Sequence, residues 1–433
     1  MMCKVNSRKL TSKRQILVLF LLFAAESAWA NLDYSYRFEV KEEFTYQWMN
    51  KESLINPGGS LFYVPKYFNR SILDTEIKFF FGEKSSLIFR NNLISQIKEK
   101  DTVTKRSIRN YVKEAYLSYW VNEGYLLNLG KENITGGLCY AFTPTDYFQY
   151  FTRDISNLND IDNQEKKNNR EGEVLLKNEL FFDWGNIMFA YGPEFEIGDF
   201  DDKQFYLIKL VSYIGSLASE LSYFCRERNN IGLGLSYSLG RSWVLQWENI
   251  FSGGSDIKTI EESDNSIPPF NFLERSNNKT FIESAVSFNY TAGNGLNIIG
   301  EYLYKQAGYS KNEWESAFDS LEPSNPKFGG NSLLYLSHMN SVLNNLEVGQ
   351  LGKHYFYIRA VKPDVFVDKL EPEIFCLTNL QDKSMVVGSK MKYSLVGRVQ
   401  LSITFNYFAG EKRSEFGLVP RKYDLIAECN FIF

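Results

Sequence analysis

The last eleven residues constrain the fold more than any other stretch of the chain. Every odd position from Tyr423 to Phe433 is apolar or aromatic, whereas Asp424, Glu428 and Asn430 occupy even positions. Because successive side chains of a strand point to opposite faces, this segment has one apolar face and one largely polar face. An outward apolar row beside an inward polar row is the pattern of a transmembrane β-barrel strand. The alternative is the final strand of a soluble β-sandwich.

The first thirty residues have the pattern of a secretory signal peptide. An apolar run over residues 16–25 is followed by a small-x-small cleavage pattern at residues 28–30, and the preceding positive charges are Lys4, Arg8, Lys9, Lys13 and Arg14. The apolar run is too short to cross a bilayer, which takes roughly 20 residues. We therefore expect a signal peptide over residues 1–30 and one barrel domain over residues 31–433.

Charge and composition exclude two classes of protein. Removing residues 1–30 takes five basic residues and Glu26 from the 48 basic and 52 acidic residues, which leaves a net charge of −8. A chain this acidic is not expected to bind nucleic acid. No run of 18 apolar residues follows residue 30, so transmembrane helices are not expected. The aromatic content of 16% suits a chain of many amphipathic strands.

Alternation of apolar and polar residues recurs along the chain. It is clearest in residues 231–239 and 399–407, where every odd position is apolar. Turns such as Gly82-Glu83-Lys84 and Asn122-Glu123-Gly124 separate neighbouring segments and are typical of β-hairpins. Counting the segments predicts an all-β fold, a transmembrane antiparallel up-and-down β-barrel of about 18 strands.

The lengths of the connections support this prediction. Alternate connections are all short, and the others include every long one, which are about 49–70, 99–106, 134–171, 195–202, 227–230, 253–277, 308–350, 381–384 and 410–419. Short turns on one rim and long loops on the other are typical of outer-membrane barrels. Reading Leu333–Leu336 as a further strand would break this order, so we place it inside loop 308–350.

A barrel of this size is expected to leave a lumen that its own wall does not fill. Loop 134–171 is apolar and rich in glycine in its first half, which predicts that this half folds into the pore as a constriction. The candidate constriction residues are Gly136, Gly137, Phe142 and Asp146. Residues 160–171 are polar and are expected to face outside. The alternative is a loop that packs against the outer rim.

Three short segments resemble a known family. They are Lys113-Glu114-Ala115-Tyr116-Leu117, Leu129-Gly130-Lys131-Glu132 and Phe142-Thr143-Pro144-Thr145-Asp146-Tyr147-Phe148. Together with Leu351-Gly352-Lys353-His354-Tyr355, they are similar to alginate-export-like outer-membrane porins of Gram-negative bacteria. Lys131 and Thr143 depart from the arginine and asparagine usual in that family, and lysine lacks the bidentate fork of arginine. The terminal Phe433 resembles the signal that such barrels present to the barrel-assembly machinery.

The polar rows predict a balanced pore wall, with eleven basic and eleven acidic side chains. The candidate pore-lining residues are Glu114, Lys209, Arg359, Glu371, Glu373, Lys390, Lys392 and Arg398. Arg359, Lys390, Lys392 and Arg398 form either a positive stripe or a set of ion pairs. A conduit for a polyanion needs a strongly positive wall, so we expect diffusion of small polar solutes instead. The alternatives are a dedicated exporter of a polysaccharide or other product, and a plugged structural or adhesin barrel.

Enzymatic activity is not expected. The chain has only two histidines, His338 and His354, and neither has a recognisable catalytic partner at a meaningful spacing. No pattern for a metal or cofactor is visible, and the spacing of Cys139, Cys225, Cys376 and Cys429 leaves a disulfide open. The expected location is the outer membrane. The expected partners are its lipid and lipopolysaccharide, the barrel-assembly machinery and a polar small-molecule or saccharide substrate.

Overall fold

The structure is a computed structural model. It describes residues 33–59, 61, 63–100, 103–148, 167, 169–197, 200–263, 269–345, 351–395 and 398–433. The predicted signal peptide, residues 1–30, lies outside these residues.

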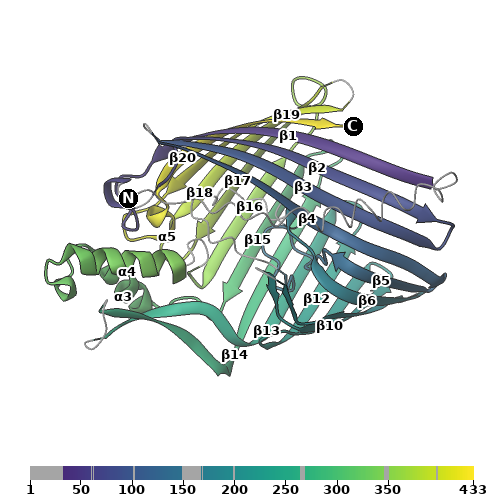
Figure 1. The fold of residues 1–433 in the computed structure, drawn as a ribbon, viewed down its shortest axis with the longest axis horizontal. Helices are drawn as coiled ribbons and strands as arrows, with labels where there is room; N and C mark the ends of the chain where they lie inside the picture. The colour runs from purple at the N-terminus through teal and green to yellow at the C-terminus, as the bar shows by residue number, and fades with distance from the viewer. Residues whose placement is uncertain are drawn as a thin grey trace.

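Eighteen strands form one sheet that closes on itself (Figure 1). The first strand, β1 (Asp33–Met49), pairs antiparallel with β2 (Tyr67–Phe81) on one side and with the last strand, β20 (Arg421–Ile432), on the other. Closure suits a bilayer, because hydrocarbon cannot satisfy the backbone groups of an open edge. The predicted all-β barrel of about 18 strands is confirmed. The other strands of the barrel are β3 (Ser85–Lys100), β4 (Val103–Asn122), β5 (Tyr125–Glu132), β6 (Glu173–Phe182), β7 (Gly185–Gly192), β10 (Phe205–Ile214), β11 (Leu217–Cys225), β12 (Asn229–Leu239), β13 (Trp243–Glu262), β14 (Phe270–Thr291), β15 (Asn297–Lys305), β16 (His354–Val361), β17 (Leu370–Asn379), β18 (Met385–Ser394) and β19 (Val399–Ala409).

Aromatic side chains lie on the outer face near both rims. At the rim with the short turns, Tyr34 and Tyr36 are 63% and 60% exposed. Near the rim with the long loops, the ring of Tyr46 lies 4.1 Å from that of Trp48 and 5.0 Å from that of Tyr67. From Tyr36 to Tyr46, a strand tilted by about 40° rises roughly 25 Å, which matches the apolar band of outer-membrane barrels.

Some strands run further toward the long-loop rim than the sequence predicts. The expected connection 99–106 is reduced to residues 101–102, and the expected connection 253–277 is reduced to residues 263–269. The predicted boundaries are wrong here because they follow the apolar row. The hydrogen-bonded ladder continues beyond the apolar band, where both faces of a strand can be polar.

The predicted loop 308–350 contains helices that strand alternation cannot reveal. Helix α3 (Lys311–Leu321) starts at a capping box in which Ser310 and Glu313 each accept the other's backbone N–H. Helix α4 (Ser332–Asn345) contains the segment Leu333–Leu336, so its exclusion from the strands is confirmed. The remaining short elements are η2 (Pro57–Gly59), β8 (Phe195–Ile197), β9 (Phe200–Asp202), η4 (Pro326–Phe328) and α5 (Glu415–Leu418).

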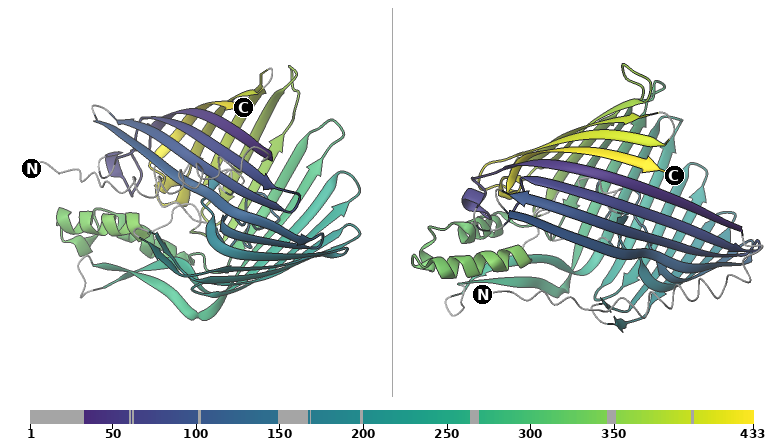
Figure 2. Two further views of the ribbon diagram at one scale, coloured as in Figure 1. Left: turned by 45° about the vertical axis from the view of Figure 1, so that its right-hand side comes forward. Right: turned by 45° about the horizontal axis from the view of Figure 1, so that its top comes forward.

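Three connections meet the tips of β13 and β14 in one apolar cluster at the long-loop rim. Ile55 from the first connection and Leu418 from the last contribute to it, together with Ile260 at the tip of β13 and Phe318 in α3. Figure 2 shows α3 and α4 at this end of the barrel. We call residues 311–345 the helical cap. The cap ties loops from distant strands of the barrel to one another.

The four cysteines of the described residues are free, so the disulfide left open by the sequence is not formed. None of the helices in the described part of the chain is long and apolar enough to cross a membrane.

Candidate functional site

The connection between β5 and β6 enters the barrel. Its residues 133–148, here called the inner loop, hydrogen-bond to side chains of β11, β13 and β15. Those side chains belong to the inner face, because Trp243 and Leu245 in the alternate row of β13 are exposed on the outside. The chemistry of the lumen is therefore set by the barrel wall and by this loop together.

Glu248 on β13 binds one turn of the inner loop. Its carboxylate accepts the backbone N–H of Leu138, the N–H of Cys139 at 2.5 Å and the N–H of Thr145 at 3.2 Å. The Thr145 hydroxyl donates to the same carboxylate at 2.7 Å, and the Gln246 side chain donates to the Leu138 carbonyl at 2.7 Å. Four donors thus converge on one acidic side chain.

Glu301 on β15 binds the next turn. It accepts the N–H of Tyr140 at 2.5 Å, of Ala141 at 2.8 Å and of Phe142 at 2.9 Å. Glu248 and Glu301 are 0% and 1% exposed, and no lysine or arginine of the described residues forms an ion pair with either. Converging backbone N–H groups bind anions well. The two carboxylates therefore hold the inner loop in place through hydrogen bonds from the loop's own backbone N–H groups.

Glycines allow the inner loop to lie close to the wall and to fold on itself. A Cβ at Gly234 on β12 would come within 2.9 Å of Leu138, and one at Gly232 would overlap the Tyr147 hydroxyl. Within the loop, Gly137 has φ +83°, and a Cβ at Gly136 would meet the Thr145 carbonyl oxygen at 2.7 Å. Glycine tolerates both the positive φ and the close approach.

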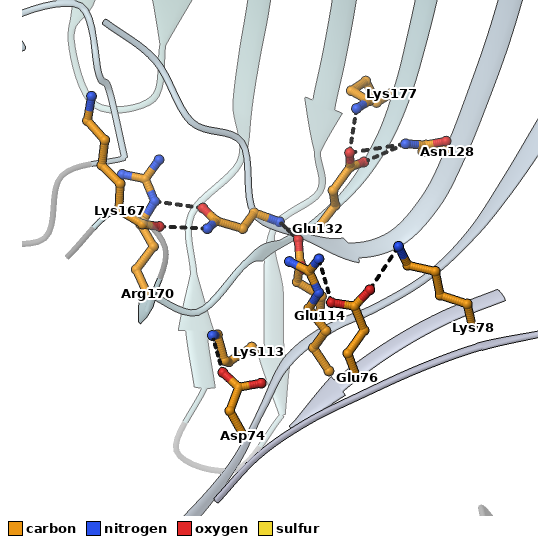
Figure 3. Close-up of polar contacts among 12 residues, drawn as sticks. Asp74, Glu76, Lys78, Lys113, Glu114, Asn128, Glu132, Lys167, Arg170 and Lys177 are labelled. Atoms are coloured by element: carbon orange, nitrogen blue, oxygen red, sulfur yellow. Dashed lines mark hydrogen bonds and ion pairs between the residues drawn. The ribbon is translucent and has the colours of Figure 1, made fainter. Parts of the chain in front are cut away.

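A row of polar contacts joins the wall of β2–β4 to the start of the inner loop (Figure 3). Glu76 pairs with Lys78 and with Arg90, and Arg90 also pairs with Glu114, each at 2.8 Å. Glu114 in turn accepts the backbone N–H of Asn133 at 3.0 Å. Glu114, a predicted pore-lining residue, therefore fixes the point at which the loop leaves the wall.

The far half of the same connection returns to the inner loop. Arg170 makes two hydrogen bonds to the Asp146 carboxylate, at 2.9 and 3.1 Å, and Lys167 donates to the Gly136 carbonyl at 2.7 Å. Burial lowers the pKa of Lys167. The expectation that residues 160–171 face outside is wrong for Lys167 and Arg170, because both are needed to satisfy buried acceptors of the loop. Residues 160–166 lie outside the described part of the chain.

Two hollows flank the inner loop. One, of about 290 Å³, lies between Thr143 and the inner wall at Arg226, and it reaches Gly254 toward the long-loop rim. The other, of about 320 Å³, is lined by Lys209 and by Tyr213, next to a short turn. One hollow thus lies between the inner loop and the long-loop rim, and the other lies between the inner loop and the short-turn rim.

The predicted pore-lining cations are largely neutralised by neighbouring acids. The ion pairs are Lys209 with Glu220 at 2.7 Å, Arg359 with Glu373 at 2.8 Å, Lys390 with Glu428 at 3.8 Å and Lys392 with Glu371 at 3.8 Å. Arg398 lies exposed at a short turn, and no described acid pairs with it. Of the two interpretations left open by the sequence, the structure therefore matches ion pairing and not a positive stripe.

Sequence reasoning missed the groups that anchor the inner loop. Glu248 and Glu301 are recognisable only as two of many inward acids, and Arg170 falls in a segment expected outside. The signal that could have pointed to the wall beneath the loop is the glycine pair Gly232 and Gly234, since inward glycines in a strand mark close approach of another backbone. Asp146, one of the candidate constriction residues, is buried and paired with Arg170.

The two histidines do not form a catalytic site that a solute can reach. His338 Nε2 lies 3.3 Å from Ser320 Oγ, but both side chains are fully buried in the helical cap. His354 Nδ1 lies 2.7 Å from the Tyr302 hydroxyl on the outer row. Among the described residues, no group of three His, Cys, Asp or Glu side chains is arranged to hold a metal ion.

Comparison with solved structures identifies the architecture. The chain superposes on OccK5 (OpdH) of Pseudomonas aeruginosa with a TM-score of 0.52 at 9% identity, covering 93% of this chain and 98% of that one. Outer membrane protein OprD of the same organism gives a TM-score of 0.50 at 9% identity, covering 92% and 93%. OccAB1 of Acinetobacter baumannii gives 0.54 at 8% identity, covering 93% and 97%. The chain has the fold of these outer-membrane barrels.

No family model matches the chain, and no curated protein matches it. The predicted outer-membrane type of barrel is confirmed by the shared fold. The finer resemblance to alginate-export-like porins stays a prediction.

Proposed function

We propose that the protein is a channel through which small polar solutes diffuse across the outer membrane of a Gram-negative bacterium. The observation that carries this proposal is the pair of hollows on either side of the inner loop, inside an 18-stranded wall. A wall of this many strands leaves an aqueous lumen unless loops fill it. The apolar band between the aromatic side chains of the two rims supports placement in a bilayer.

The inner loop is the proposed constriction. Gly136, Gly137 and Phe142 belong to the part that Glu248 and Glu301 hold against the far wall. Asp146 supports this part of the loop by binding Arg170. Because the loop is bound by seven hydrogen bonds to two carboxylates, it is expected to keep one position during conduction.

The wall supports weak charge selectivity. Paired side chains leave little net field along the path, whereas a conduit for an anionic polymer should focus positive potential on its substrate. Export of an acidic polysaccharide, the activity that the resemblance to alginate-export-like porins implies, is therefore the second candidate. Of the resembling residues, Glu114 and Asp146 serve here to hold the loop, through Asn133 and Arg170. A catalytic function is not proposed.

The chain is proposed to reach the outer membrane after export through the signal at residues 1–30, and to be inserted by the barrel-assembly machinery. Phe433 extends the outward row at the end of β20, and its N–H and carbonyl pair with Phe38 of β1. The exposed terminal ring is available to an assembly factor before the barrel closes.

Liposome swelling tests the proposed function. Purified protein should admit small neutral and charged solutes at rates that fall with their size, and it should exclude an acidic oligosaccharide. Selective uptake of that oligosaccharide would favour the exporter. Absence of all swelling, with protein shown to be folded by heat-modifiable mobility in detergent gels, would favour a plugged structural barrel.

A further inference from the structure

Exposed cations gather where β2, β3 and β4 approach the long-loop rim. Lys66, Lys105, Arg106 and Arg109 are exposed, and no carboxylate of the described residues pairs with any of them. Inside the barrel, by contrast, most wall cations have an acidic partner within 4 Å. Among the described residues, these cations therefore have no anionic partner, and they are available to an anion from outside the chain.

The register divides these cations between the two faces of the wall. Arg106 lies opposite Ile97 on β3 and in the same row as Ile108, which is 75% exposed on the outer face. Arg109 belongs to the other row, with Tyr111, whose hydroxyl contacts the inward Asn92 at 3.1 Å. Arg106 thus faces away from the lumen, and Arg109 faces into it.

Lys66 joins Arg106 on the outside. Its ammonium group lies 5.6 Å from the ring centre of Tyr46 and 5.3 Å from that of Tyr67. Both rings belong to an outer aromatic belt that continues through Trp48 to Tyr423 of β20, whose rings are 4.8 Å apart. Aromatic belts mark the boundary between hydrocarbon and head groups. Lys66 therefore lies at the level of the lipid head groups.

Arg106 lies at a similar level. Following the register from Lys66 across β3 leads to Val103 on β4, two strands away. Arg106 lies three residues from Val103 along β4, in the direction of the lipid. Two strand spacings and three residues place the backbones of Lys66 and Arg106 ~14 Å apart. Because barrel strands tilt by about 40°, this diagonal runs more nearly along the membrane surface than across it. Two outward cations thus share one face at head-group depth.

We propose that Lys66 and Arg106 bind the phosphorylated head group of an outer-leaflet lipid, the lipopolysaccharide of the outer membrane. Arginine supplies a planar fork for two phosphate oxygens, and lysine supplies a point charge beside them. A head group with two phosphates reaches both side chains. This inference rests on the outer-membrane location in the proposed function, but not on conduction.

The inward cations separate this proposal from its main competitor. The competitor is a soluble anion that passes through the lumen, and such an anion would meet the inward Arg109. Arg106 faces the lipid and would not meet it. Arg106→Ala and Arg109→Ala therefore remove the same charge from the same strand on opposite faces, and they form a matched pair. Both positions are exposed, so neither change empties a packed site.

Native mass spectrometry of the folded barrel in detergent, titrated with bis-phosphorylated lipid A, tests the proposal. Lys66→Ala and Arg106→Ala should each weaken lipid binding about tenfold, as expected for loss of a charge-assisted contact, and the double variant should weaken it further. Arg109→Ala should leave binding unchanged. Dephosphorylated lipid should bind all variants equally weakly, and inorganic phosphate at the same concentration should not displace the lipid.

Two results would overturn the lipid site. One is equal binding by the wild-type protein and the double variant, and the other is an equal loss in Arg109→Ala. Displacement by inorganic phosphate would assign the cations to a soluble anion instead. Swelling of liposomes by the same proteins is measured in parallel, so that loss of lipid binding with intact conduction, or the reverse, separates this inference from the proposed channel.

Discussion

At the scale of single residues, two buried carboxylates without cation partners determine where the inner loop lies. Replacing Glu301 with Gln keeps the shape but turns one acceptor oxygen into a donor, so at least one N–H among Tyr140, Ala141 and Phe142 loses its partner. We expect a loss of about 1–3 kcal/mol in the free energy of unfolding, the cost of an unsatisfied buried group. We also expect larger current noise, because the loop moves more. Unfolding in detergent and single-channel recording measure the two effects.

The matched control is Glu371→Gln. Glu371 is half-buried and lies 3.8 Å from Lys392, so its loss should change neither stability nor noise appreciably. Equal effects of the two substitutions would contradict the anchoring role of Glu301.

Gly232 tests the close approach of loop and wall. In Gly232→Ala the new methyl group would overlap the Tyr147 hydroxyl and break its 2.8 Å hydrogen bond to Ser222. We expect lower stability of the loop, and a smaller further loss when Tyr147→Phe has already removed the hydroxyl. A double-mutant cycle read by unfolding measures this coupling. Gly253→Ala, whose Cβ meets only ordinary contacts, is the control, and additive effects of Gly232→Ala and Tyr147→Phe would refute the contact.

At the scale of elements, the helical cap contains a buried histidine that should respond to acid. His338 is fully buried, and its ring lies 4.9 Å from Phe270 and 5.8 Å from Phe328. Burial lowers the pKa of His338 to about 4, whereas an opened cap would restore a value near 6.5. As pH falls below 6.5 the opened cap takes up a proton that the closed cap does not, until about pH 4. The closed cap should therefore lose about 2 kcal/mol of stability by pH 5.

Amide hydrogen exchange of α4 between pH 7 and pH 5, corrected for the intrinsic pH dependence, checks this expectation. The His338→Phe variant keeps an aromatic ring but cannot be protonated, so its cap should open equally at both values. The same pH dependence in wild-type and variant proteins would assign the effect to other groups, such as the buried Glu415.

The elements also show how far the sequence could be read. Strands were predictable wherever one row faces lipid, as in residues 231–239, because that row must be apolar. The ends of β3 and β4 at the long-loop rim were not, because residues such as Lys100 and Lys105 lie beyond the apolar band. Helices α3 and α4 follow a different period, and the capping box of Ser310 and Glu313 marks the start of α3 alone. The anchors of the inner loop were hidden because Leu138 and Glu248 are 110 residues apart.

At the scale of the whole molecule, the paired wall predicts weak ion selectivity. In a salt gradient across a planar bilayer, the reversal potential of the wild-type channel should lie close to zero. Glu373→Gln should free Arg359 and shift the potential toward anion selectivity. Glu371→Gln, which leaves the closer pair intact, should shift it less. A strongly anion-selective wild-type channel would instead support the exporter.

The central claim is that the inner loop narrows an open barrel, and single-channel conductance tests it most directly. We predict discrete conductance steps for the wild-type protein. We predict larger steps for a variant lacking residues 136–148 in which Glu248→Gln and Glu301→Gln remove the charges that the loop would leave unpaired. Conductance that is the same with and without the loop, from barrels that are folded in both cases, would contradict the account.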